Sequence, residues 1–296
     1  MEKYTQEWFK DRALNSIRKI SDGVWDFSDS LLLYTASGSE VYEQLQEVDT
    51  PYFNLVTKLE HEYLQSIAKN IADILPDNFE FIDLGPGTEH KEQFLFDELQ
   101  KQGKTFTYTP VDISDHFLTI AESHVSKQGI PVRRIKASFE ELPELLGESH
   151  TPRFVSIGLT FSNYEPQNVL TLLANIAGKN GYAFINAQMR DRVDMNKLQT
   201  VYQDDAIYLV DDKVRLIDLD PIQDISPRLV DDGFRMSCFI LQNNDVLESI
   251  GIKTGDKMFV FQSLRYTKEG LENELRDYNH ESFDTGSSFI GTVIKT

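Results

Sequence analysis

The sequence has 296 residues, of which 40% are hydrophobic and 26% charged, a composition typical of folded globular proteins and predicting about two domains. Its 48 acidic and 29 basic side chains give a formal net charge of −19 at pH 7, which argues against binding to nucleic acid or anionic lipid. The single cysteine, Cys238, predicts no internal disulfide and a reducing, cytoplasmic location. The pattern of the first residues predicts no signal peptide, and no run of roughly 18 apolar residues predicts a segment that would cross a bilayer. The oligomeric state is not predicted.

The first 75 residues carry apolar side chains at helix-like spacing, and we expect this segment to be helical. Within it, residues 31–39 are expected to form a loop and residues 40–48 a short helix. From Phe79 onward, short apolar runs alternate with segments of helical spacing. Strands are expected at 79–84, 105–111, 132–135, 154–158 and 182–186, and a helix at 167–177. This alternation predicts an α/β fold with a parallel, doubly wound, Rossmann-like sheet.

Between residue 187 and about residue 265 the alternation is lost, aspartate is frequent, and strand-like runs occur at 234–241 and 258–264. We expect this segment to be an inserted α+β domain that forms a substrate-binding lid with the N-terminal residues. Thr267 is a candidate N-cap for a helix extending to Tyr278, and residues 287–294 are expected to form a closing strand. The expected domains are a core of residues 61–187 and 266–296, and a substrate-binding lid of residues 1–60 and 188–265.

The strongest local motif is DLGPGT at residues 83–88, which follows an apolar strand and precedes a helix. Gly85 and Gly87 let the backbone approach a ligand closely and direct helix N–H groups toward it. A dinucleotide-binding turn would have a third glycine where this sequence has His90, and no Walker phosphate loop follows. Asp112 ends the second strand, where a carboxylate accepts the ribose hydroxyls of a nucleoside or, alternatively, caps a helix. This combination favours S-adenosylmethionine over a dinucleotide.

Several segments accompany this motif in a consistent order: LYTASGSEVY at 33–42, PYF at 51–53, YTPVDIS at 108–114 and GLTFSNY at 158–164. Together they resemble the S-adenosylmethionine-dependent histidine Nα-methyltransferase family of ergothioneine biosynthesis, which includes fungal N-methyltransferases of prenylated tryptophan. The resemblance covers roughly residues 30–190. It implies a class I methyltransferase fold, S-adenosyl-L-methionine as cofactor, and a small amine or amino acid as methyl acceptor.

The cofactor-binding residues implied by the resemblance are Gly85, Pro86, Gly87, Lys91, Asp112, Ile113, Ser138 and Phe139. The glycines and Lys91 would hold the methionine part of the cofactor, Asp112 would bind the ribose, and Phe139 would lie beside the adenine. The family usually has an aspartate before this phenylalanine, which accepts from the adenine amino group. The hydroxyl of Ser138 substitutes for it only in part.

The acceptor-binding residues implied by the resemblance are Tyr52, Thr160, Asn163, Phe261 and Ser263. Tyr34 and Asn163 would act in catalysis by orienting the acceptor amine, with water or a side chain removing its proton. The structural alternatives are a turn role for Asn163 and simple packing for the tyrosines. Phe261 stands where the family has a glutamate that binds the histidine imidazole. Losing this carboxylate removes a charge-assisted hydrogen bond worth roughly 1.5–3 kcal/mol. We therefore expect an apolar or aromatic acceptor and not free histidine.

Two other function classes stay open at this point. A regulatory, non-catalytic S-adenosylmethionine-binding protein would keep Gly85 and Asp112 while its acceptor pocket differs from that of the enzymes. A nicotinamide oxidoreductase would need the complete pyrophosphate loop that position 90 lacks. The six histidines show no metal-ligand spacing, and no Gly-x-Ser-x-Gly nucleophile motif is present.

Overall fold

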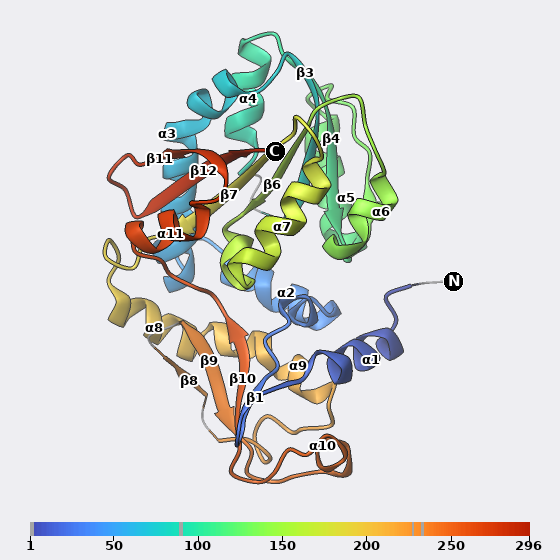
Figure 1. The fold of residues 1–296 in the computed structure, drawn as a ribbon. Helices are drawn as coiled ribbons and strands as arrows, with labels where there is room; N and C mark the ends of the chain where they lie inside the picture. Colours follow the sequence, from blue (N-terminus) through green and yellow to red (C-terminus); the bar gives the residue numbers. More distant parts are fainter. Residues whose placement is uncertain (1–2, 89–90, 227, 232–233) are drawn as a thin grey trace. The chain divides into compact units, whose positions relative to one another are not determined.

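The structure is a computed structural model that describes residues 3–88, 91–226, 228–231 and 234–296. His90, the residue that distinguishes the glycine turn from a dinucleotide-binding turn, lies outside these residues. The chain divides into two compact units (Figure 1). Unit 1 comprises Met1–Tyr52 and Asp194–Leu264, and unit 2 comprises Phe53–Val193 and Arg265–Thr296. No helix within the described residues has the length and apolar character needed to span a membrane.

Unit 2 is built on a seven-stranded sheet with the strand order β11-β12-β7-β6-β3-β4-β5 (Figure 1). The parallel strands are β3 (Asn78–Leu84), β4 (Thr105–Asp112), β5 (Ile135–Lys136), β6 (Arg153–Gly158) and β7 (Tyr182–Gln188). Two antiparallel strands, β12 (Phe289–Lys295) and β11 (Asn279–Phe283), extend one edge. The Rossmann-like doubly wound class is confirmed, although the sheet is mixed and not wholly parallel.

Helices cover the sheet of unit 2. They are α3 (Lys58–Ile74), α4 (Gln93–Lys101), α5 (Asp115–Ser126), α6 (Leu142–Leu146), α7 (Pro166–Ala177) and α11 (Lys268–Leu275). Short turns of helix precede or follow the strands: η2 (Phe53–Thr57), η3 (Phe139–Glu141) and η4 (Leu159–Asn163). Residues of α3, α4 and α5 share one apolar core with the sheet. At its centre, the ring of Phe81 lies 4.9 Å from that of Phe154 and 5.4 Å from that of Phe96. Each buried phenylalanine contributes about 1.5–3 kcal/mol to this core.

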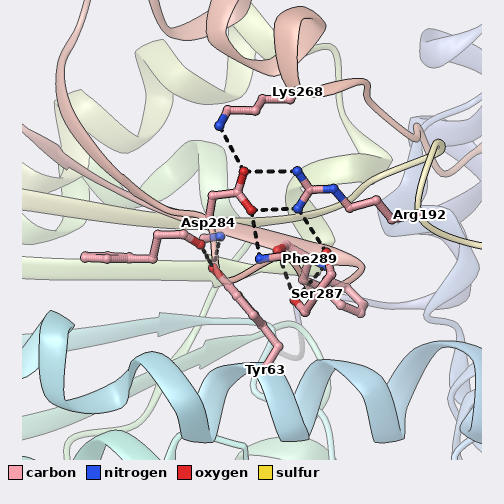
Figure 2. Close-up of polar contacts among 9 residues, drawn as sticks. Tyr63, Arg192, Lys268, Asp284, Ser287 and Phe289 are labelled. Carbon is pink, nitrogen blue, oxygen red and sulfur yellow. Dashed lines mark hydrogen bonds and ion pairs between the residues drawn. The ribbon is translucent and has the colours of Figure 1, made fainter.

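A polar network fixes the connection between β11 and β12 (Figure 2). Arg192 donates to Asp284 through both terminal nitrogens, at 2.7 Å and 3.0 Å, and Lys268 donates to the same carboxylate at 2.9 Å. These cations lower the pKa of Asp284 well below its ordinary value. Nearby, the Tyr63 hydroxyl donates to the Phe283 carbonyl at 2.5 Å, which attaches α3 to β11.

Unit 1 contains a five-stranded sheet with the order β1-β2-β10-β9-β8. Its strands are β1 (Arg18–Ser21), β2 (Val24–Asp26), β8 (Leu229–Val230), β9 (Arg235–Phe239) and β10 (Lys257–Gln262). Its helices are α1 (Gln6–Ser16), η1 (Ser30–Leu33), α2 (Ala36–Leu45), α8 (Met195–Asp204), η5 (Ala206–Val210), α9 (Asp211–Arg215) and α10 (Asp245–Ile250). Because β2 pairs in parallel with β10, the two chain segments of the unit form one sheet.

Lys213 of α9 is fully buried in unit 1. Its Nζ donates to the Asp29 carbonyl at 2.7 Å and lies 4.7 Å from the centre of the Phe27 ring. Burial lowers the pKa of Lys213 to about 7, although the carboxylates of Asp29 and Asp26 act in the opposite direction.

Several expected boundaries in unit 1 were wrong. The N-terminal segment is not helical throughout, because residues 18–26 form a hairpin that turns at Gly23, where φ is 68°. This hairpin depends on β10, a partner more than two hundred residues away. The loop expected at 31–39 and the helix expected at 40–48 are replaced by η1 and by α2, which begins earlier. Thr35 caps α2, since its Oγ1 accepts from Gly38 N at 3.2 Å.

In unit 2, the strand expected at 132–135 reduces to β5 at 135–136 and an isolated bridge between Val132 and Tyr108. Thr267 does cap α11, accepting from Gly270 N at 3.0 Å, but the helix ends at Leu275 and not at Tyr278. Strand β11 was not predicted at all. Most of its residues are polar and partly exposed at the sheet edge, so its sequence lacks the apolar pattern of the inner strands.

Candidate active site

The glycine motif forms the turn after β3 in unit 2. Gly85 and Gly87 have φ angles of 70° and 62°, in the left-handed region that glycine adopts readily. The Gly85 N–H donates to the Val111 carbonyl at 2.9 Å, which attaches the turn to β4. A Cβ at Gly85 would lie 3.5 Å from the Phe139 ring and 4.0 Å from Thr160 Oγ1. Three segments assigned to the site from sequence therefore meet at the carboxyl end of the sheet.

A buried hydrogen bond between Tyr108 and Asp83 lies next to the glycine turn. Tyr108 OH donates to Asp83 Oδ2 at 2.6 Å, and burial together with this carboxylate raises the pKa of Tyr108 well above its usual value. Pro86 and Gly87 line a small pocket together with Tyr108 and His124. Asp83 at the end of β3 and the turn residues Pro86 and Gly87 therefore all lie beside Tyr108.

Asp112 ends β4 and is 9% exposed. Its Oδ1 accepts from Ser114 N at 2.8 Å, whereas the Ser114 hydroxyl makes no capping bond to α5. Burial raises the pKa of Asp112 to about 7, and the negative charge of Asp83 raises it as well. The backbone N–H groups of Ser114 and Ile113 act in the opposite direction, because they donate to the ionised carboxylate. A buried carboxylate of this kind suits a ligand that brings hydroxyl donors, so the residue fits the expected ribose of the cofactor.

Ser138 and Phe139 open η3. The Ser138 N–H and hydroxyl both contact Glu141 Oε2, at 3.0 Å and 3.1 Å. These contacts form a capping box between Ser138 and Glu141 at the start of η3. The Phe139 ring lies 6.3 Å from the Tyr164 ring and against Gly85.

Lys91 lies close to the end of β6. Its Nζ is 3.6 Å from Glu60 Oε1, and a Cβ at Gly158 would lie 3.5 Å from the same nitrogen. Glu60 was missed in the sequence analysis, although it falls on the buried face of α3 with Tyr63 and Ile67. An acidic residue on an otherwise apolar helix face was the signal that could have found it.

Thr160 and Asn163 belong to η4, the turn that follows Gly158, and both are partly buried. In the same turn Ser162 is fully buried, and its Oγ has no hydrogen-bond partner among the described residues. Asn163 ends this turn, as the turn alternative supposed, so its role toward an acceptor stays a prediction.

In unit 1, expected acceptor residues converge on a residue that the sequence analysis missed. The Tyr202 ring is stacked on Phe261 at 6.1 Å and tilted against Tyr52 at 6.0 Å. It also packs edge-on against Phe234 at 5.1 Å, and its hydroxyl donates to Ser263 Oγ at 3.1 Å. We call Tyr52, Tyr202, Phe234, Phe261 and Ser263 the aromatic cluster. Tyr202 lies on the buried face of α8, outside the region of resemblance, so no motif marked it.

Tyr34 is also in unit 1, where it follows η1 and packs edge-on against Tyr42 at 5.9 Å. The two expected catalytic residues, Tyr34 and Asn163, therefore belong to different units. Within the described part of the chain, no group of three or more histidine, cysteine, aspartate or glutamate residues is arranged to hold a metal.

The chain resembles known proteins at the level of sequence and of structure. A family model described as histidine-specific, S-adenosylmethionine-dependent methyltransferase matches residues 18–209. The N-methyltransferase dtpB of Aspergillus flavus is 28% identical over 135 residues, which make up 44% of this chain and only 37% of that protein.

Among solved structures, an S-adenosylmethionine-dependent methyltransferase from Clostridium acetobutylicum is similar with a TM-score of 0.42 and 13% identity, over 88% of this chain and 97% of that chain. The 1,6-didemethyltoxoflavin-N1-methyltransferase of Burkholderia thailandensis, solved with bound 1,6-didemethyltoxoflavin and S-adenosylhomocysteine, has a TM-score of 0.47 and 12% identity. That similarity covers 90% of this chain and 88% of the other.

Proposed function

Because the chain belongs to the family of histidine-specific, S-adenosylmethionine-dependent methyltransferases, we propose that it methylates the amino nitrogen of an amino acid or related small amine. We infer further that the side chain of this acceptor is apolar or aromatic and that free histidine is not the preferred acceptor. In this proposal unit 2 holds the cofactor, and the aromatic cluster of unit 1 receives the acceptor.

The cofactor assignment agrees with the residues of unit 2. Asp112 would accept from the ribose hydroxyls, Ser138 Oγ and Phe139 would contact the adenine, and the turn at Gly85 would let the backbone approach the methionine part. Bound S-adenosylmethionine supplies a methyl group activated by its sulfonium, and the protein supplies binding and orientation.

The acceptor class is carried by one observation, the stacking of Phe261 on Tyr202 beside Ser263. Phe261 is 5% exposed, so an imidazole placed there would lose its contacts with water and find no carboxylate at this position. An aromatic or apolar side chain would instead gain ring contacts, which add about 0.5–1.5 kcal/mol beyond burial. The similarity to an N-methyltransferase supports nitrogen as the methylated atom.

Methyl transfer to an amine requires an unprotonated nitrogen that is held in line with the transferred group. We infer that the Asn163 side chain of unit 2 holds the amine in this orientation and that water receives its proton; Tyr34, in unit 1, is the second residue to which the resemblance assigns an orienting role. Tyr34 and Asn163 both carry groups able to hydrogen-bond an amine, whereas neither is a strong base.

An assay with labelled S-adenosylmethionine and a panel of histidine, phenylalanine, tyrosine, tryptophan and indole amines tests this proposal. We expect N-methylated products from aromatic amines at a kcat/KM at least tenfold above that for histidine. A preference for histidine would refute the acceptor class. Cofactor binding without turnover on any amine would favour the regulatory alternative.

A further inference from the structure

Three polar side chains of unit 2 meet beside the end of β6, and we call them the Glu60 cluster. Glu60 is 4% exposed and Asn186 is fully buried. Asn186 Nδ2 donates to Glu60 Oε1 at 2.9 Å, and Lys91 Nζ lies 3.6 Å from the same oxygen. The cluster therefore places one anionic and one cationic group together in a largely buried location.

Protein contacts leave hydrogen-bonding capacity in this cluster. Asn186 Oδ1 is buried and has no hydrogen-bond partner among the described residues. Both contacts to Glu60 fall on Oε1, and the 3.6 Å separation from Lys91 Nζ is longer than a hydrogen bond. Buried polar atoms of native proteins normally have partners, so an unpaired acceptor next to a carboxylate indicates a missing donor.

The backbone at the end of β6 comes close to the cluster. Gly158 ends β6 with a φ of 53°. A Cβ at this position would lie 3.5 Å from Lys91 Nζ and 3.8 Å from Glu60 Oε1. A pocket lined mainly by apolar side chains of α3, α4 and the sheet also reaches Lys91, Glu92, Ser156 and Gly158.

The cluster also borders the glycine turn. Strand β6 is the neighbour of β3 in the sheet, and the turn follows β3. Thr160, two residues after Gly158, is the residue that a Cβ at Gly85 would approach to 4.0 Å. A nucleoside ligand on the turn would therefore have its tail close to the Glu60 cluster.

We propose that Glu60 and Asn186 are recognition residues for the α-ammonium group of the cofactor. In this arrangement Glu60 and Asn186 Oδ1 accept from the ammonium group, and Lys91 donates to the α-carboxylate of the cofactor. The cluster therefore binds both charges of the zwitterionic amino-acid end. This inference rests on the proposed function, which supplies S-adenosylmethionine as the ligand. It assigns the ammonium of that ligand to Glu60 and its carboxylate to Lys91.

Calorimetric titration with three probes separates these contributions. S-adenosylhomocysteine carries the ammonium and the carboxylate, its decarboxylated analogue carries only the ammonium, and 5′-methylthioadenosine carries neither; all three are neutral at sulfur. For Glu60→Gln we expect Kd to rise about tenfold for the first two probes and to change less than twofold for the third. For Lys91→Met we expect a similar rise for S-adenosylhomocysteine alone. Glu62→Gln, an exposed residue of the same helix, is the matched control and leaves every Kd unchanged.

Asn186→Ser removes the side-chain amide, both Oδ1 and the Nδ2 donor to Glu60, without changing either charge, and provides a second test if Glu60→Gln fails to fold. It is expected to weaken the two ammonium-bearing probes severalfold and to leave 5′-methylthioadenosine unchanged. The inference is overturned if these substitutions leave the Kd of S-adenosylhomocysteine unchanged or lower it. Equal weakening of all three probes would also overturn it, since that indicates a general structural role. Failure of the wild-type protein to bind any probe would instead refute the cofactor assignment on which the inference rests.

Discussion

Protonation of Asp112 should control the affinity for the cofactor. The pKa of this buried carboxyl is about 7, so neutral and ionised forms are both present near physiological pH. Ribose hydroxyls donate to the ionised form better than to the neutral one, and binding therefore lowers the pKa of Asp112 and releases a proton. The affinity should rise with pH up to about pH 8 and then level off.

The size of the effect follows from the ionised fraction. With a pKa of about 7, roughly a tenth of Asp112 is ionised at pH 6 and roughly nine tenths at pH 8. When only the ionised form binds, the observed Kd is the intrinsic value divided by this fraction. We therefore expect Kd to be about tenfold weaker at pH 6 than at pH 8, and about a hundredfold weaker at pH 5.

Calorimetric titration with S-adenosylhomocysteine between pH 5.5 and 8.5 measures this dependence, and buffers of different ionisation enthalpy count the released proton. Asp112→Asn should bind weakly at every pH and lose the slope. Asp115→Asn, an exposed position at the start of α5, is the control that should keep it. A wild-type Kd that stays within twofold across this range would refute the argument.

Three further substitutions test other parts of the structure. Because the pKa of Lys213 is about 7 when folded and ordinarily 10.5, its ammonium lowers stability most at and below pH 7. The gain in unfolding free energy from Lys213→Met should therefore shrink by about 1.4 kcal/mol per pH unit above 7; the fluorescence of the two tryptophans during urea unfolding measures it. Asp284→Asn should cost roughly 1–2 kcal/mol at neutral pH. Since folding lowers the pKa of Asp284 well below its ordinary value of 3.8, this loss should shrink progressively as pH falls below about 4 in thermal unfolding monitored by circular dichroism. Phe261→Glu should raise kcat/KM for histidine about tenfold and lower it for aromatic amines, since a charge-assisted bond replaces ring stacking.

Local patterns in the sequence were sufficient for most inner strands and for the glycine turn of unit 2. Each inner strand is a short apolar run, and the glycine turn and the acid at Asp112 follow directly from positions at strand ends. These features depend on a few consecutive residues, because the sheet period and the turn conformation are local properties. The resemblance supplied the expected roles of the other site residues.

The same reasoning could not find features whose partners are distant in the sequence. The hairpin of β1 and β2 depends on β10, and the polar edge strand β11 depends on pairing with β12. Glu60 reads as an ordinary helix residue until Asn186 and Lys91 are placed beside it. In each case the contact that determines the feature joins segments too far apart in the sequence for a short-range pattern to include both.

The sequence by itself determined the doubly wound sheet and the glycine turn, since each depends on residue type and short-range spacing, and the family resemblance indicated that Phe261 stands in place of a glutamate. Only the tertiary structure decided that Tyr202 joins Tyr52, Phe261 and Ser263, and that the Asp112 carboxyl is buried enough to titrate near neutral pH. Side-chain contacts and burial arise only when folding brings distant groups together. The size of a pKa shift then depends on how much water the fold excludes from the group.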